Sequence, residues 1–109
     1  VSLVGPHRDE LSISLAGLPA RTHASQGEQR TLALALRLTA HLLVTEVVGS
    51  APVLLLDDVF SELDPDRSAA LLANLPPGQA VLTSAAGYPE GADPQRVLVV
   101  RDGQVVPSD

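Results

Sequence analysis

The sequence of 109 residues contains no cysteine and no lysine, and its only aromatic side chains are one Tyr and one Phe. The lack of cysteine excludes disulfides, zinc–thiolate sites and thiol catalysis. The lack of lysine excludes a phosphate-binding P-loop within this chain, and it also excludes Schiff-base chemistry. With so few aromatic rings, the packing must rest on Leu, Val and Ala.

The charge balance is acidic, with thirteen Asp and Glu against seven Arg and a formal net charge of −6. A free-standing nucleic-acid binder is normally basic, so this composition argues against that class. The hydrophobic share of 45% is typical of a globular chain rather than a disordered one. We expect a cytoplasmic protein without a membrane partner, because no apolar run looks long enough to span a bilayer and no signal-like start is present.

The length allows one domain or a piece of one. Residues 1–4 are apolar and β-leaning and do not include an initiator methionine. We therefore expect residues 1–109 to be one fragment of a larger protein. Residues 11–15 alternate apolar and polar side chains, which predicts a half-buried strand, and residues 16–19 have the composition of a turn.

A long helix is the strongest local prediction. Ser25 is followed three residues later by Glu28, the spacing of a capping box. A run rich in Leu and Ala follows, so we expect a helix over residues 27–48 that ends at Gly49. Its apolar residues go nearly all the way round, which predicts that most of the helix is buried.

The second half of the chain has an α/β pattern. Residues 53–56 form a continuous apolar run, which predicts a strand covered on both faces, and Asp64-Pro65 is an N-cap followed by proline at the first helical position. The further expected elements are a helix at 65–75, a strand at 80–83, a loop at 87–94, and strands at 96–100 and 104–106 joined by a turn at Asp102-Gly103. The order helix, strand, helix, strand predicts a parallel sheet with flanking helices and a C-terminal hairpin.

Asp57 and Asp58 directly follow the first of these buried strands. Ligands of open α/β sheets gather at the carboxyl ends of the strands, and a carboxylate there can hold Mg²⁺. Adjacent acids on an extended backbone point in opposite directions, so one can hold the metal while the other orients or deprotonates a water. The alternative is that the two acids simply end a strand and cap a turn.

The start of the long helix is a second candidate site. Helix starts offer unpaired N–H groups and a partial positive charge that suit a phosphate, and Gly27 allows a close approach to the backbone. Ser25 could cap the helix or bind a phosphate oxygen, whereas the acid Glu28 in the first turn disfavours the phosphate. The alternative is an ordinary capping box, which contributes about 1 kcal/mol.

Taken in order, these features resemble the second half of an ABC-type ATPase head: a serine-led glycine helix start, a long helix, an apolar strand, an acid pair and an Asp-capped helix. Three blocks are also similar to the carboxy-terminal part of the RecF family, which comprises SMC-like ATPases of bacterial DNA replication and repair. These blocks are Gly-Pro-His-Arg-Asp-Glu at 5–10, Ala-Ser-Gln-Gly-Glu-Gln-Arg at 24–30 and Leu-Leu-Leu-Asp-Asp-Val-Phe-Ser-Glu-Leu-Asp at 54–64. The resemblance extends from residue 1 to about residue 83 and is weak after residue 87.

The resemblance implies a role for each matching residue. Asp57 would be the Walker B residue that holds Mg²⁺, mostly through water, and Asp58 would polarise the attacking water. Most relatives have Glu at the second position, so the shorter Asp implies slow turnover. Thr83 or Ser84 would replace the switch histidine of most ABC heads. The remaining motifs are the signature, Ser25, Gln26, Gly27, Glu28 and Gln29, and the D-loop, Ser61, Glu62, Leu63 and Asp64.

The resemblance also implies a function that needs two copies of the protein. ATP bound to Walker A and Walker B of one protomer would be closed over by the signature helix of the other, with the Walker A lobe outside this chain. The expected partners are a second protomer, double-stranded DNA, single-strand/double-strand junctions, RecR and RecO, in recombinational repair and the SOS response. The isolated 109 residues are expected to be inactive, and most DNA contacts are expected to lie outside them.

Three alternatives remain open from the sequence. The chain could be a non-catalytic interaction module that keeps the shape of the head, although such a module has no need of an acid pair. It could belong to another SMC-like or ABC ATPase, such as a transporter subunit, or to a metal-dependent phosphatase-like fold with further carboxylates. His7 and Arg8 could line the nucleotide edge or brace a turn, whereas His23 and His41 are expected to be ordinary packed or surface residues.

Overall fold

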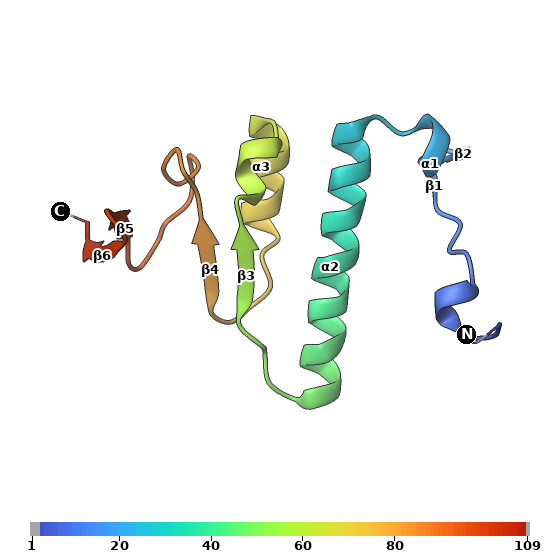
Figure 1. The fold of residues 1–109 in the computed structure, drawn as a ribbon, viewed down its shortest axis with the longest axis horizontal. Helices are drawn as coiled ribbons and strands as arrows, with labels where there is room; N and C mark the ends of the chain where they lie inside the picture. The colour runs from blue at the N-terminus through green and yellow to red at the C-terminus, as the bar shows by residue number, and fades with distance from the viewer. Residues whose placement is uncertain (1–2, 109) are drawn as a thin grey trace. The chain divides into compact units, whose positions relative to one another are not determined.

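The computed structural model describes residues 3–108 (Figure 1). The chain divides into two compact units. One unit comprises the chain up to Leu54 together with Pro76–Ala80. The other comprises Leu55–Leu75 and the chain from Val81 onward. Of the apolar, β-leaning start predicted at 1–4, the first two residues lie outside the described part, and Leu3 and Val4 form no strand.

The first unit begins with short elements. A 3₁₀ helix, η1 (Pro6–Arg8), is followed by a small hairpin of β1 (Ser14–Leu15) and β2 (Leu18–Pro19) and by a single-turn helix, α1 (Ala20–His23). The strand predicted at 11–15 is therefore much shorter than expected, and α1 was not predicted. The physical reason is that a two-residue partner strand offers few ladder hydrogen bonds, so pairing does not extend further along the alternating segment.

Of the turn predicted at 16–19, the first two residues are confirmed as a turn, whereas Leu18–Pro19 form β2. Ala16 and Gly17, which join β1 to β2, both have left-handed backbones, with φ of 51° and 79°. Two successive positive φ values match the right-handed twist of a tight hairpin. The Ala20 N–H then donates to the Ile13 carbonyl over 2.8 Å, and Ala20 is buried.

Helix α2 (Gln26–Val48) confirms the predicted long helix almost to the residue. Ser25 is its N-cap, and Gly49 ends it in the left-handed conformation, with φ of 82°, while donating its N–H to Thr45 O over 2.9 Å. The hydroxyls of Thr31, Thr39 and Thr45 each donate to the carbonyl four residues earlier, which satisfies these groups on an otherwise apolar helix.

The expectation that α2 is mostly buried is wrong for this chain. None of its residues is buried, and Val47 and Val48 are 76% and 67% exposed. Helix α2 is also long and apolar enough to cross a membrane by length and composition alone, with a mean hydropathy of 1.5. This corrects the expectation that no segment reaches that length, although a core helix passes the same test. The helix is exposed because few other described residues pack against it.

The strands β3 (Leu54–Asp57) and β4 (Ala80–Thr83) pair with each other and confirm the predicted parallel sheet. The Leu54 N–H donates to Gln79 O over 2.9 Å, and four residues later the Asp58 N–H donates to Thr83 O over 3.2 Å. The register advances in the same direction on both strands, which is the mark of parallel pairing, and both arrows point the same way in Figure 1.

The sequence predicted that these strands are buried, with the first covered on both faces, and this prediction is wrong within the described residues. Leu56 is 4% exposed, but its neighbour Leu55, which points to the opposite face, is 71% exposed, and Val81 on β4 is 45% exposed. The continuous apolar run at 53–56 therefore has the composition of a strand buried on both faces, but only one face is covered by the described residues.

The rest of the second unit follows the predicted order. A 3₁₀ helix, η2 (Val59–Glu62), leads into α3 (Pro65–Ala73), which ends two residues earlier than predicted because Asn74 leaves the helical conformation, with φ of −115° and ψ of 16°. The final hairpin joins β5 (Leu98–Arg101) to β6 (Gln104–Pro107). Asp102 and Gly103 form its turn with φ of 51° and 73°, as predicted from that dipeptide.

Candidate functional site

The acid pair lies at the carboxyl end of the parallel strands. Asp57 is the last residue of β3, and Thr83 is the last residue of the neighbouring strand β4. The Thr83 hydroxyl donates to Oδ1 of Asp57 over 2.5 Å. The Asp58 N–H donates to the same Thr83 hydroxyl oxygen over 3.0 Å. The structure thus joins three of the residues singled out from the sequence through one hydroxyl group.

Asp58 departs from the extended backbone that the sequence argument assumed. Its φ of 50° and ψ of 29° place it in the left-handed region, where it is also the N-cap residue of η2. A single left-handed residue turns the chain sharply out of the strand, and Asp tolerates this conformation better than most residues. The side chains of Asp57 and Asp58 are therefore separated by this turn, and not by the alternation of a strand.

The carboxylates of Asp57 and Asp58 are both accessible to a ligand. Both acids are exposed, and the carboxylate of Asp58 makes no hydrogen bond or ion pair within residues 3–108. A hard cation such as Mg²⁺ accepts carboxylate oxygen and keeps several waters, so Asp57 suits it as one protein ligand among water and phosphate oxygens. The described residues contain no cluster of three or more His, Asp or Glu side chains that could hold a metal ion.

The start of α2 has a complete capping box. Glu28 N–H donates to Oγ of Ser25 over 3.2 Å, and Ser25 N–H donates to Oε1 of Glu28 over 3.0 Å. A serine hydroxyl has one donor and two acceptor positions, so accepting the Glu28 N–H leaves the Ser25 O–H as a donor. Ser25 is exposed and Gly27 is half-buried, so the helix start is accessible.

The other signature residues, Gln26 and Gln29, are exposed as well. Gln29 Nε2 donates to Ala24 O over 3.2 Å and to Arg21 O over 3.4 Å, which ties the helix start to the preceding turn. The capping box uses the Ser25 hydroxyl as an acceptor and a phosphate would use it as a donor, so the two interpretations left open by the sequence are compatible.

The segment Ser61-Glu62-Leu63-Asp64 connects the acid pair to α3. The Ser61 hydroxyl donates to the Asp58 carbonyl over 2.9 Å, and Leu63 is half-buried. Asp64 caps α3, as predicted, by accepting the Arg67 N–H over 2.8 Å, and its other oxygen lies 3.0 Å from Arg67 Nη1. The cap uses both carboxylate oxygens of Asp64.

Other singled-out residues lie in local contacts. Ser84 accepts the Ala86 N–H over 3.2 Å and has no bond to the acid pair, so of the two proposed switch residues only Thr83 contacts it. His7 and Arg8 are exposed on η1, and His41 is half-buried on α2. His23 shares a 2.8 Å hydrogen bond with the Thr22 hydroxyl.

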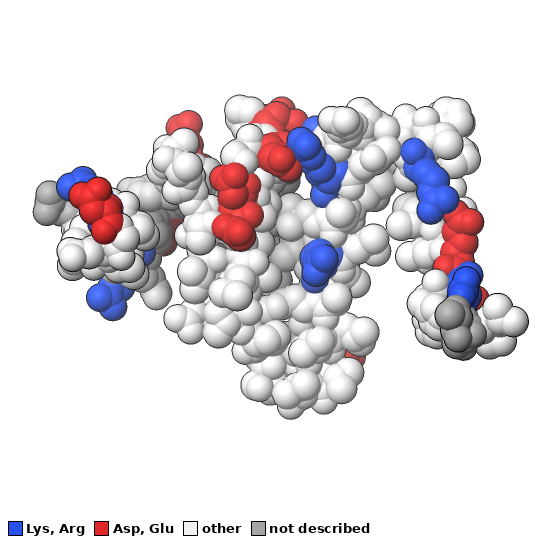
Figure 2. Space-filling view, viewed as in Figure 1, with Lys and Arg blue, Asp and Glu red and all other residues white. Residues whose placement is uncertain are grey.

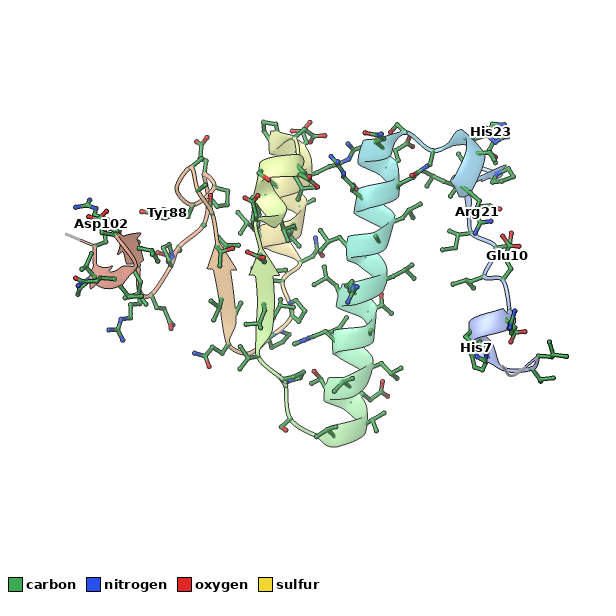
Figure 3. The ribbon with its side chains drawn as sticks, in the orientation of Figure 1. His7, Glu10, Arg21, His23, Tyr88 and Asp102 are labelled. Atoms are coloured by element: carbon green, nitrogen blue, oxygen red, sulfur yellow. The ribbon has the colours of Figure 1, made fainter. Side chains whose placement is uncertain are left out.

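No large basic patch is visible on the face of the described residues that Figure 2 shows. Figure 2 shows acidic and basic side chains interspersed on a mostly uncharged surface. Near the chain start, Glu10 and Arg21, labelled in Figure 3, form an ion pair at 2.8 Å. With side-chain exposures of 81% for Arg21 and 69% for Glu10, this pair contributes little to stability.

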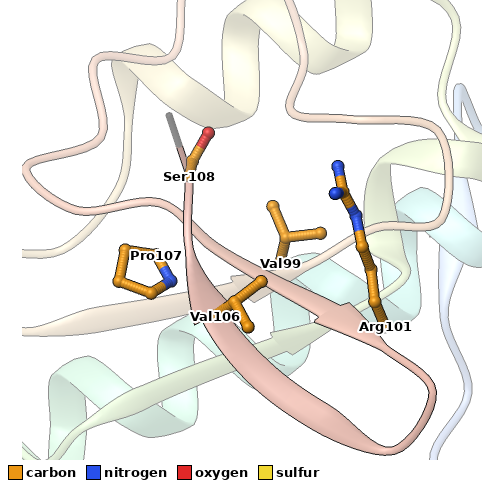
Figure 4. Close-up of a pocket in the computed structure, with 5 residues that line it drawn as sticks. All are labelled: Val99, Arg101, Val106, Pro107 and Ser108. Carbon is orange, nitrogen blue, oxygen red and sulfur yellow. The ribbon is translucent and has the colours of Figure 1, made fainter.

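A hollow on the C-terminal hairpin is separate from the acid pair. Its lining residues are Val99, Arg101, Val106, Pro107 and Ser108 (Figure 4). Its lining residues include one cationic side chain, Arg101, and no carboxylate. None of the residues singled out from the sequence lines it. This hollow is therefore not where the chemistry-bearing residues gather.

Comparison with known proteins agrees with these motifs. The "DNA replication and repair protein RecF" of Acaryochloris marina is 48% identical over 109 residues, which cover 96% of this chain and 29% of that protein. The RecF of Parasynechococcus marenigrum is 45% identical over 95% of this chain and 29% of its own length. The chain matches the carboxy-terminal part of RecF proteins. It spans less than a third of the length of these RecF relatives.

A solved structure supports the same conclusion for the fold. The "recombination mediator protein RecF-ATPrS in RecFOR pathway" aligns with a TM-score of 0.71 and 37% identity, covering 97% of this chain and 28% of that chain. The fold is thus a partial α/β head of the ABC-ATPase type, as predicted. No family model matches the chain. Helix α2 carries four charged residues along its length.

The sequence singled out the residues of this site but did not predict the hydrogen bonds between them. Thr83 was singled out as a substitute for a switch histidine, but its bonds to both acids depend on the register between β3 and β4, which local sequence does not encode. The Ser61 bond to Asp58 likewise depends on the left-handed turn at Asp58, for which the polar Asp-Asp pair was the only available signal.

Proposed function

We propose that this chain is the carboxy-terminal part of a RecF-type ATPase head that supplies the signature, Walker B and D-loop motifs to an ATP site shared by two protomers. The observation that supports it best is the pairing of Asp57 with Thr83 at the carboxyl ends of two parallel strands, the edge where α/β sheets bind nucleotides. The similar RecF structure that was solved with ATPrS supports ATP as the ligand.

Asp57 and Asp58 would have different roles at one nucleotide site. Asp57 would hold Mg²⁺ with water and phosphate oxygens as the other ligands, and the ion would neutralise charge on the phosphates. Asp58, whose carboxylate has no partner within residues 3–108, would orient the attacking water and take up its proton. Asp is one methylene shorter than Glu, so we expect slow turnover.

The signature helix would serve the nucleotide of the other protomer. The exposed Ser25 hydroxyl keeps a donor for a γ-phosphate oxygen, and the helix N-terminus adds favourable electrostatics. ATP that binds only the closed pair stabilises the dimer, and hydrolysis releases it. The dimer would act on double-stranded DNA and strand junctions, with RecR and RecO as partners implied by the family resemblance.

The experiment is nucleotide-dependent association of the full-length protein. We expect the wild-type protein to form a dimer with ATP and Mg²⁺, measured by light scattering, and to return to monomer as ATP is consumed. Asp58→Asn should form the same dimer but hold it much longer. Asn tolerates the left-handed backbone of Asp58, so this variant changes the chemistry and preserves the turn.

Asp93→Asn, in the exposed loop after β4, is the matched control and should behave as wild type. Wild-type rates of ATP hydrolysis in Asp58→Asn would contradict the role assigned to Asp58. A protein that remains monomeric with ATP in every variant would contradict the shared site itself.

A further inference from the structure

Thr83 makes three hydrogen-bond connections to two successive acids. Its hydroxyl oxygen is 2.5 Å from Oδ1 of Asp57 and 3.0 Å from the Asp58 nitrogen, and its carbonyl oxygen accepts the same Asp58 N–H over 3.2 Å. The partners are 26 and 25 residues away in sequence, so these bonds exist only because β3 and β4 lie side by side.

The direction of each hydrogen bond follows from the groups involved. A backbone N–H only donates, so the Thr83 oxygen must accept from Asp58. An ionised carboxylate only accepts, so the Thr83 O–H must donate to Asp57. The single hydroxyl therefore uses its one proton on the first acid and a lone pair on the second, and the rotor of Thr83 has one orientation that satisfies both.

Two properties of the acid pair depend on this arrangement. The bond to Oδ1 orients the Asp57 carboxylate and leaves Oδ2 without a hydrogen bond in the described part of the chain. The bond to the Asp58 N–H supports a left-handed residue, a conformation that L-residues other than Asn and Asp rarely adopt. One side chain thus sets both the direction of one acid and the turn at the next.

We propose that Thr83 is a positioning residue that aligns Asp57 for Mg²⁺ and holds Asp58 in place for its water. This inference rests on the proposed ATPase function. It differs from a switch residue that reaches the phosphate, because the Thr83 hydroxyl is already used by the protein's own acids. The positioning role requires a hydroxyl group at residue 83 and does not require a larger or positively charged side chain.

The test uses three variants of the full-length protein. Thr83→Val keeps the shape and removes the hydroxyl, Thr83→Ser keeps the hydroxyl, and Thr39→Val makes the same chemical change on α2, where the hydroxyl bonds only Ala35 O. The measurements are the Mg²⁺ concentration for half-maximal ATP hydrolysis, kcat, the KM for ATP and the urea midpoint.

We expect Thr83→Val to raise the half-saturating Mg²⁺ concentration about tenfold and to lower kcat by a similar factor, as expected for loss of one hydrogen bond to a charged group. The KM for ATP, measured at saturating Mg²⁺, should change little. Thr83→Ser should restore most of the Mg²⁺ response, and Thr39→Val should match wild type in both quantities.

Wild-type Mg²⁺ response and kcat in Thr83→Val would overturn this inference, and the ATPase function would stand if Asp58→Asn still lengthened the dimer lifetime. Equal losses in Thr83→Ser and Thr83→Val, accompanied by lower urea midpoints, would also overturn it by showing that packing and not the hydroxyl matters. Absence of Mg²⁺-dependent hydrolysis in the wild-type protein would overturn both proposals.

Discussion

The Ser61 hydroxyl donates a 2.9 Å hydrogen bond to the main-chain oxygen of Asp58. Asp58 is thereby held on both sides, since its N–H is bonded to Thr83 and its carbonyl to Ser61. The second acid of the pair is fixed through its backbone, which leaves its carboxylate available to a ligand. Ser61 belongs to the segment that connects the acid pair to Asp64, the N-cap of α3.

The left-handed backbone at Asp58 predicts a graded response to substitution. Asp58→Ala should lower the free energy of unfolding of the full-length protein by about 1–2 kcal/mol, because Ala has no local polar contact to offset a positive φ. Asp58→Asn and Asp58→Gly should cost less. Urea unfolding of the three variants measures this order, and an Ala variant as stable as Asn would contradict the strained turn.

The cap of α3 predicts a second stability effect. Asp64→Ala removes the acceptor of the Arg67 N–H and should lower the free energy of unfolding by about 1 kcal/mol. Asp64→Asn keeps a capping oxygen and should retain most of that stability. Because Arg67 and Asp64 are both substantially exposed, the ion pair adds little, and a much larger loss would indicate a different role for Asp64.

These elements differ in how far the sequence alone could predict them. The capping box at Ser25, the exit at Gly49, the cap at Asp64 and the turn at Asp102-Gly103 were all predicted correctly, because each depends on residues that are neighbours in sequence. The predicted burial of α2 was wrong, since burial depends on what lies against a helix and not on its own composition.

In the candidate site, too, the sequence predicted the residues but not the contacts between distant parts of the chain. Asp57, Asp58 and Thr83 could each be singled out from their position after an apolar run. Their connection could not, because it depends on the register of two strands separated by η2 and α3. The short strand β1 was overestimated for a related reason: alternation of side chains predicts a strand only where a partner is available to pair with it.

The shared site predicts that the 109 residues alone are inactive. They contain no lysine and hence no Walker A lysine, so an isolated sample with ATP and Mg²⁺ should hydrolyse ATP no faster than buffer. The measurement is phosphate release, with the full-length protein as the positive control. Turnover by the 109 residues at the rate of the full-length protein would show that the site is not divided between parts.

The most direct test of the shared site is the effect of Ser25→Arg placed on the Asp58→Asn background of the full-length protein. The large cation should block the seam, so light scattering with ATP and Mg²⁺ should report a monomer that still binds ATP. Ser25→Thr keeps a capping hydroxyl and should leave the dimer in place. A dimer that persists in the Ser25→Arg variant would contradict the claim that this helix start grips the nucleotide of a second copy.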